Sequence, residues 1–301
     1  MTFQLELGDW DRLAAQQIFG ARDVAEEVSK LLPAEECFFL ASSAGMLIGL
    51  RLVDGSRVAL KAVRPRPGLG EARDVQRALH ERGFPCPRPL VGPVRLADGY
   101  AFVDEWVDGE QQDLHEPRRR REAARLLAEL ISLAPQHKDL PRALEGHGLF
   151  PQPHHSRFDF DRADGDWIDR IAVCVRDDRC EERFVTGHSD WGARHFGWDG
   201  DRIAVVYDWP DSLVRDAEET IVGQASAVFP STWDLPVMPK AATHEESEAF
   251  VDEYEAAAGR SLDRRQVAAA RLYLLAYCAR CELSDLAGAE GDFQAALRAQ
   301  A

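Results

Sequence analysis

The sequence predicts an α+β protein of two lobes, a small N-terminal lobe built on an antiparallel sheet with a helix and a larger, mainly helical C-terminal lobe. Three observations predict this. Strand-like runs cluster in residues 37–63, and apolar residues at helical spacing dominate from residue 121 onward. Strand character returns once more, in residues 184–212. A chain of 301 residues is long enough for one bilobed domain or for two linked domains.

The first elements follow from local patterns. Residues 9–32 have helical character and precede the strands. Within residues 37–63, β-rich runs meet at Asp54-Gly55, which is a strong hairpin signal. Residues 68–83 fit a helix of about three turns. The helix is expected to stop at Gly83, because glycine readily adopts the left-handed conformation that follows many helices.

A proline-rich connector and one further strand complete the N-terminal lobe. Prolines at positions 85, 87 and 89 predict extended backbone, because a proline disfavours helical conformation in the residue before it. The segment "YAFVDEWVDG" is typical of a strand that ends at Gly109, where the composition becomes polar. We therefore place a hinge here, with residues 1–108 in the N-terminal lobe and residues 109–301 in the C-terminal lobe.

The second half is predicted to be mainly helical. One helical face is defined by apolar residues at i, i+3, i+4 and i+7, namely Leu127, Leu130, Ile131 and Ala134. Residues 243–259 open with a capping box, Thr243 and Glu246, and close at a glycine. Residues 262–281 form another long helix, which contains the CxxC pair Cys278 and Cys281. Those two thiols are therefore expected to be buried in a helix rather than to bind zinc, which would require a second ligand pair.

Composition excludes several classes of function. The formal net charge of −16 argues against nucleic acid as a partner, because phosphate backbones are bound by clustered Lys and Arg. The first residues lack the pattern of a secretory signal, and no apolar run is long enough to span a membrane. We therefore expect a cytoplasmic protein that binds neither nucleic acid nor membrane. The sequence gives no indication of oligomeric state.

A lysine, a glutamate and two aspartates occur in an order along the chain that suggests a common site. A lysine lies in the strand "VALKAV", a glutamate begins the next helix, and the C-terminal lobe contributes "HSD" and "YDW". A lysine on a strand can neutralise nucleotide phosphates, and two aspartates can act as a base and a metal ligand. Phosphoryl transfer needs little more, because its catalysis consists mostly of positioning and charge stabilisation.

These residues resemble the aminoglycoside phosphotransferase family, the small-molecule branch of the protein-kinase-like fold. The similar layout runs from about residue 35 to about residue 285. The family carries an H-x-D-x-x-x-x-N loop followed by a strand that ends in I-D-W or a similar triplet. This chain has His188, Asp190 and the pair Asp208-Trp209 at matching positions. The resemblance implies a protein-kinase-like fold whose N-terminal lobe binds the nucleotide.

The resemblance also implies roles for individual residues. Asp190 would be the catalytic base that accepts the proton of the substrate hydroxyl, in a loop held by hydrogen bonds of His188. Asp208 would hold magnesium against the phosphates of ATP. Lys61 would pair with the α- and β-phosphates, and Glu71 would orient it from the helix.

Two further segments are implied to contact the nucleotide. In the segment "FVDEWVDG", backbone groups near Glu105, Trp106 and Val107 would meet the adenine. The turn "LASSAGMLIG" lacks the pattern G-x-G-x-x-G but has the small residues that a cover over the phosphates needs. Its candidate residues are Ser42, Ser43 and Gly45.

The chain departs from the family's pattern at position 195, where His195 replaces the asparagine that gives magnesium an oxygen ligand. Magnesium prefers oxygen ligands in a near-octahedral shell, whereas imidazole suits softer transition metals. Three explanations remain open: a mechanism with one metal ion, an altered metal preference such as Mn²⁺, or nucleotide binding without turnover. We favour retained activity, because Asp190 and Asp208 are both present. A metal hydrolase that uses the same histidines and aspartates would leave the lysine strand and the hinge unexplained.

The sequence therefore predicts an ATP-dependent phosphotransferase that acts on a hydroxyl group of a small molecule, such as an aminoglycoside or another metabolite. The alternative is a catalytically impaired, kinase-like protein that binds nucleotide. Carboxylates in residues 211–226 and 243–255 could hold a cationic acceptor or could form solvated faces. Trp191 and Trp209 flank the two aspartates and are candidates for walls of the substrate cleft.

Overall fold

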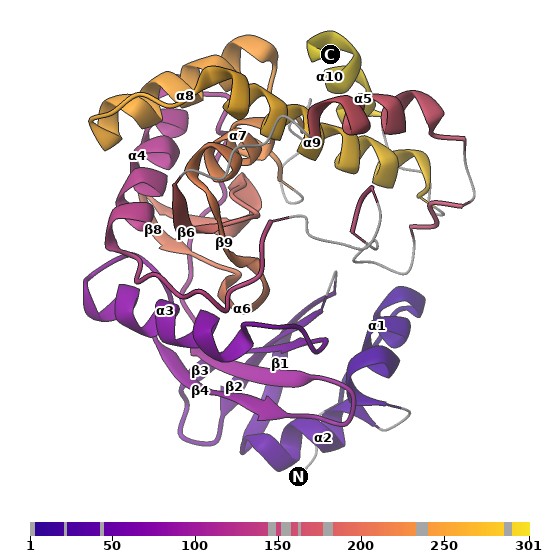
Figure 1. Ribbon diagram of the computed structural model, residues 1–301. Coiled ribbons are helices and arrows are strands. Elements are labelled where there is room, and N and C mark those ends of the chain that lie inside the picture. Colours follow the sequence, from indigo (N-terminus) through magenta and orange to yellow (C-terminus); the bar gives the residue numbers. More distant parts are fainter. Residues whose placement is uncertain are drawn as a thin grey trace.

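A computed structural model describes residues 4–20, 23–42, 45–143, 149–151, 158–161, 164–176, 183–232, 240–285 and 291–301. Figure 1 shows a sheet flanked by helices at the bottom and a mainly helical part above it. This arrangement confirms the predicted α+β fold. No helix in the described part of the chain combines the length and the apolar character needed to cross a membrane.

The lower lobe is built on one antiparallel sheet of five strands. The strands are β1 (Ala34–Ser42), β2 (Met46–Leu52), β3 (Arg57–Val63), β4 (Pro89–Arg95) and β5 (Tyr100–Glu105), in the spatial order β1-β2-β3-β5-β4. The predicted hairpin joins β2 to β3, and Gly55 in its turn has a φ of +83°. Lys61 lies in the central strand β3 opposite Leu47 of β2 and Phe102 of β5.

Strand β4 was not predicted from the sequence. Its segment was expected to be only an extended connector, because proline removes a hydrogen-bond donor from a strand. The strand tolerates Pro89 and Pro93 because it lies at the edge of the sheet and pairs on one side only, with β5. The extended backbone that the prolines predict is therefore correct, and the missing information was the partner strand.

Three helices flank the sheet: α1 (Asp9–Phe19), α2 (Val24–Leu31) and α3 (Leu69–Glu81). The apolar faces of α1 and α2 are buried in one cluster with β1, β2, β3 and β5, so the N-terminal helices belong to the core of the lower lobe. Helix α3 ends before Gly83, whose φ is +82°, as predicted. Its buried residues Ala72, Val75 and Leu79 instead belong to the same cluster as residues of the upper lobe. The division of the chain at residue 108 stays a proposal, since this packing crosses it.

The upper lobe contains most of the helices and two small antiparallel pairs of strands (Figure 1). In chain order its elements are α4 (Pro117–Leu133), α5 (Asp166–Arg176), β6 (Phe184–His188), the 3₁₀ helix η1 (Ala193–His195), β7 (Phe196–Asp199), β8 (Arg202–Val206), α6 (Trp209–Ser212), β9 (Leu213–Ala217), α7 (Glu218–Val228), α8 (His244–Ala258), α9 (Arg264–Leu283) and α10 (Asp292–Gln300). Strand β6 pairs with β9, and β7 pairs with β8. Helix α7 is buried along almost its whole length and packs against α9 and α8.

Several predictions for this lobe are confirmed and one is wrong. Helix α8 has the predicted capping box of Thr243 and Glu246. Cys278 and Cys281 lie in α9 as free thiols, with Cys281 buried as predicted and Cys278 only partly buried. Strand character was expected to end at residue 212, but β9 continues it to Ala217. The five residues of β9 are almost all buried, so they lack the alternation of polar and apolar residues that identifies a half-exposed strand.

Two glycines, Gly109 and Gly197, allow the backbone at the hinge to pass very close to the backbone of the upper lobe. Glu110 and Trp198 exchange backbone hydrogen bonds of 3.1 and 2.9 Å directly after the hinge. A Cβ atom on Gly109 would lie 2.3 Å from Cα of Gly197, and a Cβ on Gly197 would lie 2.5 Å from the hydroxyl oxygen of Tyr207. The connection between the lobes therefore depends on the absence of side chains at both positions.

We expect Gly109→Ala to lower the free energy of unfolding by about 1–3 kcal/mol, because the new methyl group overlaps backbone that cannot move without breaking the bridge to Trp198. Gly70→Ala is the matched control, since a Cβ there would meet no atom within 4 Å. That change lies in a helix and should be neutral or slightly stabilising. Urea unfolding of both variants measures the difference, and equal stabilities would contradict the steric explanation.

Helix α10 is attached to α9 by a carboxylate with an unusual pKa. The oxygens of Glu282 accept hydrogen bonds from the backbone N–H groups of Phe293 and Gln294, both at 3.0 Å. Burial raises the pKa of Glu282 to about 7 and outweighs these hydrogen bonds, which lower it. The folded protein therefore binds more protons than the unfolded chain between the unfolded pKa and pH 7.

The expected consequence is a loss of stability as the pH rises from about 5 to 8, because a raised carboxyl pKa stabilises the fold at low pH only. The free energy of unfolding should fall by about 1 kcal/mol or more over this range. Glu282→Gln should flatten this part of the profile, as measured by urea unfolding at several pH values. An unchanged slope in the variant would show that another group is responsible.

Candidate active site

A buried histidine fixes the loop that carries the first aspartate. His188 ends β6 and is only 1% exposed. Its Nε2 lies 3.1 Å from the carbonyl oxygen of Tyr207, while its Nδ1 accepts a hydrogen bond of 3.2 Å from the backbone N–H of Asp190. Burial lowers the pKa of His188 to about 3, so the ring is neutral and donates from Nε2. His188 thus positions the loop and does not itself face the reacting groups.

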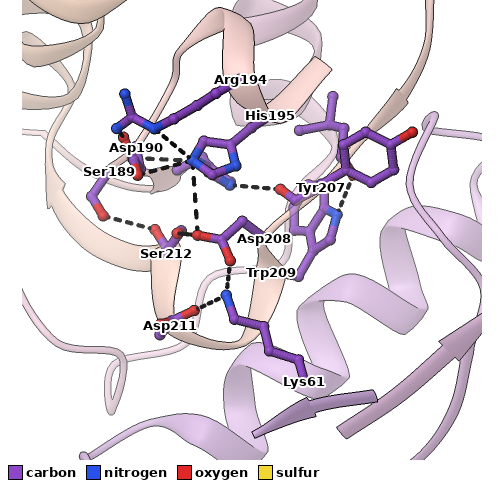
Figure 2. A network of polar contacts seen from close by, with 12 residues as sticks. Lys61, Ser189, Asp190, Arg194, His195, Tyr207, Asp208, Trp209, Asp211 and Ser212 are labelled. Carbon is purple, nitrogen blue, oxygen red and sulfur yellow. Dashed lines mark hydrogen bonds and ion pairs between the residues drawn. The ribbon is translucent and has the colours of Figure 1, made fainter. Parts of the chain in front are cut away.

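Asp190 is held by two neighbours that follow it in the chain. Arg194 donates to Oδ1 of Asp190, and Nε2 of His195 lies 2.9 Å from Oδ2 (Figure 2). Burial on its own would raise the pKa of Asp190, but the charge of Arg194 and the contact with His195 outweigh it and hold the pKa well below its usual range. Asp190 is therefore ionised and acts as a hydrogen-bond acceptor at neutral pH.

His195 stands between the two aspartates. Its Nε2 lies 4.0 Å from Oδ2 of Asp208 and 3.1 Å from Nε of Arg194. Burial lowers the pKa of His195, and the contact with Asp190 opposes this shift only in part. Arg194 donates to an unprotonated Nε2, whereas Asp190 requires a protonated one, so the position of the ring proton decides which contact is a hydrogen bond.

Asp208 occupies a backbone conformation that few residues tolerate. Its φ is +72°, and it is the one residue other than glycine with a positive φ in the described ranges. This left-handed conformation is acceptable to Asp and Asn but unfavourable for most side chains. It directs the carboxylate toward β3, where Oδ1 forms an ion pair with Lys61 and Oδ2 accepts a hydrogen bond of 2.8 Å from Ser212.

The ion-pair partners of Lys61 differ from the partner that the sequence led us to expect. Lys61 forms ion pairs with Asp208 and Asp211 and none with Glu71, which begins α3. The expected orientation of Lys61 by Glu71 is therefore not present in this structure. Asp211, the first residue of a segment considered for contacts with a cationic acceptor, supplies the second carboxylate. Arg66, which no sequence pattern indicated, donates to the backbone carbonyl of Asp211 and so joins the same network across the two lobes.

The arrangement can hold a divalent cation. Ligand atoms of Asp190, His195 and Asp208 all lie within 4.8 Å of one another, and they form the one such group in the part of the chain that the structure describes. Two carboxylate oxygens suit Mg²⁺, which prefers oxygen and usually keeps several waters. Carboxylate oxygens suit Mn²⁺ as well, and the imidazole nitrogen is a ligand typical of transition metals. The donor atoms thus fit one divalent ion, Mg²⁺ or Mn²⁺.

The hinge residues are arranged by contacts of their own. The backbone N–H groups of Glu105 and Trp106 donate to the carbonyls of Arg88 and Arg57, at 3.0 and 3.1 Å. The carbonyl of Val107 accepts a hydrogen bond of 2.9 Å from the hydroxyl of Tyr207, which links the hinge to the strand before Asp208. The role of these three hinge residues in binding adenine remains a proposal.

The turn between β1 and β2 lies close to β3. A Cβ atom on Gly45 would lie 2.5 Å from the carbonyl oxygen of Ala62, so only glycine allows this approach. The hydroxyl of Ser42 donates to Asp11 of α1. Ser43 lies outside the described residues. The predicted phosphate contacts of this turn therefore remain proposals, and in this structure Ser42 faces helix α1.

Some expected substrate contacts are structural instead. Trp191 and Trp209 are 0% and 1% exposed and donate to the carbonyls of Ala123 and Val206, so neither lines a cleft. Asp216 and Glu218, from a segment considered for a cationic acceptor, are also buried. Asp216 binds Arg142 and the N–H of Ala143, and Glu218 accepts from Tyr254. These groups have neither of the roles considered for them, since they are buried in ion pairs and hydrogen bonds.

The comparisons agree with this geometry. Residues 50–270 match the phosphotransferase enzyme family, APH. Because this match spans most of the chain, the protein belongs to that family and has the class of fold that small-molecule phosphotransferases share with protein kinases. A search of curated proteins finds no match.

Solved structures with the same fold cover nearly the whole chain. One is amicoumacin kinase hAmiN in complex with AMP-PNP, Ca²⁺ and Ami, with a TM-score of 0.69, 14% identity, and coverage of 93% of this chain and 92% of that chain. Another is a thermostable mutant of aminoglycoside phosphotransferase APH(4)-Ia in ternary complex with ADP and hygromycin B, with a TM-score of 0.58, 14% identity and coverage of 92% and 98%. A third is aminoglycoside phosphotransferase from Alicyclobacillus acidocaldarius, with a TM-score of 0.53, 14% identity and coverage of 98% and 92%.

Proposed function

We propose that this phosphotransferase transfers the γ-phosphoryl group of ATP to a hydroxyl group of a small molecule. The observation that carries the proposal is the convergence of Lys61, Asp190, His195 and Asp208 from both lobes on one place (Figure 2). The membership in the phosphotransferase family supports it. Solved neighbours bound to AMP-PNP or ADP make ATP the natural donor to test.

Each residue of the site has its own role in the reaction. Lys61 exchanges a carboxylate partner for the α- and β-phosphates. Asp208 and Asp190 hold a divalent cation, Mg²⁺ or Mn²⁺, together with His195. When bound, this cation neutralises charge on the phosphates and orients them. Glu105, Trp106 and Val107 contact adenine, and the turn with Ser42, Ser43 and Gly45 covers the phosphates.

Asp190 orients the acceptor hydroxyl and receives its proton. The new bond joins the hydroxyl oxygen to phosphorus, and the bond to the bridging oxygen breaks, with its electron pair retained by ADP. A carboxylate with so low a pKa is a weak base, but the loose transition state of phosphoryl transfer needs proton removal only late. Orientation is therefore the larger part of its contribution.

The acceptor is proposed to be an aminoglycoside-like or other small metabolite with an exposed hydroxyl. The net charge of −16 favours a cationic acceptor, because an acidic surface concentrates cations near a cleft. The structural roles of Asp216 and Glu218 remove two carboxylates from the candidates for direct contact.

A second candidate function is nucleotide binding without turnover. One observation favours it: both oxygens of Asp190 are engaged, by Arg194 and by His195, at the position where an acceptor hydroxyl would bind. The presence of a complete lysine and aspartate set favours the active phosphotransferase over this alternative.

Thermal melting with ATP, with and without Mg²⁺ or Mn²⁺, followed by ADP release with a panel of hydroxyl acceptors, tests the proposal. We expect a metal-dependent rise in melting temperature and ADP release that increases with one class of acceptor. A shift that does not need metal, without ADP release from any acceptor, would establish the nucleotide-binding alternative. No shift with ATP under any condition would reject both.

A further inference from the structure

Arg194 lies within the candidate site, and the mechanism described so far does not use it. Its guanidinium donates to Oδ1 of Asp190, and its Nε lies 3.1 Å from Nε2 of His195 (Figure 2). Its side chain is 18% exposed, so it is mostly enclosed but open on one side. A cation thus adjoins the two groups that would meet the acceptor and the metal.

The backbone around Arg194 is fixed, which gives the side chain a defined starting point. The N–H groups of Ala193 and Arg194 donate to the carbonyls of Phe229 and Ser231, at 2.9 and 3.0 Å, after helix α7. The N–H of His195 donates at 2.9 Å to the carbonyl of Gly192 within the 3₁₀ turn. The backbone of Arg194 is therefore held by hydrogen bonds to the segment that follows α7, so a change of partner at Arg194 would involve its side chain and not its backbone.

The balance of charge around this point leaves little room for two metal ions. The network contains three carboxylates, Asp190, Asp208 and Asp211, and three cations, since Lys61 and Arg194 form ion pairs with them and Arg66 donates to the carbonyl of Asp211. Protein kinases commonly neutralise the phosphates with two metal ions. Here the described residues provide one group of metal ligands, and the guanidinium of Arg194 lies beside it.

We propose that Arg194 is a catalytic cation that takes the place of a second metal ion, an inference that rests on the proposed phosphotransferase function. In the resting protein the guanidinium pairs with Asp190. In the reaction it contacts an oxygen of the transferred phosphoryl group while Asp190 accepts the hydroxyl of the acceptor. It neutralises the charge that develops as the bond from phosphorus to the bridging oxygen of ADP breaks and the bond to the acceptor oxygen forms. Arginine suits this role because its fork of N–H groups matches phosphate oxygens.

The first test counts metal ions and does not depend on turnover. Equilibrium binding of Mn²⁺ to the full chain saturated with AMP-PNP, followed by electron paramagnetic resonance, should give one tightly bound ion per protein. The double variant Arg194→Asn/His195→Asn removes the cation and adds two amide oxygens, so it should bind a second ion. Two tight ions in the unmodified protein would overturn the proposal.

The second test uses ATP with water as the acceptor and measures ADP release. Arg194→Gln should lower kcat by about 10²- to 10³-fold and change the KM for ATP by less than about threefold, since an interaction specific to the transition state acts on kcat. Arg194→Lys should recover part of the rate because it keeps the charge. Arg125→Gln, which removes an i,i+4 ion pair of 2.7 Å to Glu129 on α4, is the matched control and should leave kcat unchanged.

The outcomes separate this inference from the function on which it rests. Nucleotide binding with one Mn²⁺ and a loss of kcat in Arg194→Gln supports both. Binding with two ions, or Arg194→Gln with the kcat of the unmodified protein, rejects the role of Arg194 and leaves the phosphotransferase in place. Absence of AMP-PNP binding in the unmodified protein rejects the proposed function and the role of Arg194 together.

Discussion

Asp208→Asn is expected to lower the rate of phosphoryl transfer by about 10³-fold or more, because it removes a charged ligand from the metal group and one carboxylate partner from Lys61. The fold should be preserved. Asparagine tolerates the left-handed conformation of position 208 as well as aspartate does, and its oxygen can still accept from Ser212. The measurement is kcat for ADP release together with the dependence of nucleotide binding on Mg²⁺.

Asp252→Asn provides the control for this experiment. Asp252 lies on α8, is 70% exposed and forms an ion pair with Arg264, so its neutralisation changes the net charge by the same amount away from the site. It should not affect the rate. An Asp208→Asn protein with the melting temperature and the kcat of the unmodified protein would show that the metal group has been misassigned.

Arg73→Met is expected to lower the free energy of unfolding by about 3–5 kcal/mol, because it leaves the buried carboxylate of Asp104 without its cation. Arg73 is 2% exposed, donates to Asp104 and Gln76, and also donates to the backbone carbonyls of Val91 and Val103. Burial raises the pKa of Asp104, and the charge of Arg73 opposes that shift. Urea unfolding at pH 7 measures the loss.

The double variant Arg73→Met/Asp104→Leu separates the cost of leaving Asp104 unpaired from the cost of losing the carbonyl contacts of Arg73. Replacement of both charges by apolar groups removes the unpaired carboxylate, so the double variant should recover much of the stability lost by the single one. A double variant that is less stable than Arg73→Met would mean that the carbonyl contacts of Arg73, and not its pairing with Asp104, account for most of the loss.

This buried pair also explains how α3 is held in the lower lobe. The sequence led us to expect an ion pair between Lys61 and Glu71 as the link from the sheet to α3. The structure makes its charged link two residues later in the helix, from Arg73 to Asp104 of β5. Because β5 leads into the hinge, this pair fixes α3 against the strand that carries the proposed adenine contacts.

Much of the fold could be predicted because the relevant signals are local. A hairpin at Gly55, a helix stop at Gly83 and a capping box at Thr243 all depend on a few adjacent residues. Strand β4 pairs with the next strand, β5, whereas β9 pairs with β6, from which several other elements separate it along the chain. The prolines in β4 made it difficult to recognise as a strand. In β9, the burial of nearly all residues removed the alternation that identifies a half-exposed strand.

The site shows the same division between local and distant information. Motif spacing identified Lys61, Asp190, His195 and Asp208, and the structure brings them together. The partners of these residues could not be predicted, because they depend on how a side chain reaches across the lobes. Arg66 and Arg194 were missed, because Arg66 reaches its partner across the lobes and Arg194 meets Asp190 in a loop, where the i,i+4 spacing of an α-helix does not apply.

The contacts that cross the lobes have a consequence for the kinetics of nucleotide entry. Lys61 reaches Asp208 and Asp211, Arg66 reaches the carbonyl of Asp211, and the hydroxyl of Tyr207 reaches Val107. Two lobes joined in this way lose little orientational freedom when a ligand binds between them, so the ordering cost of binding is small. Association should then be limited by the breaking of these ion pairs, and because they are largely enclosed, added salt should change the rate of nucleotide entry little.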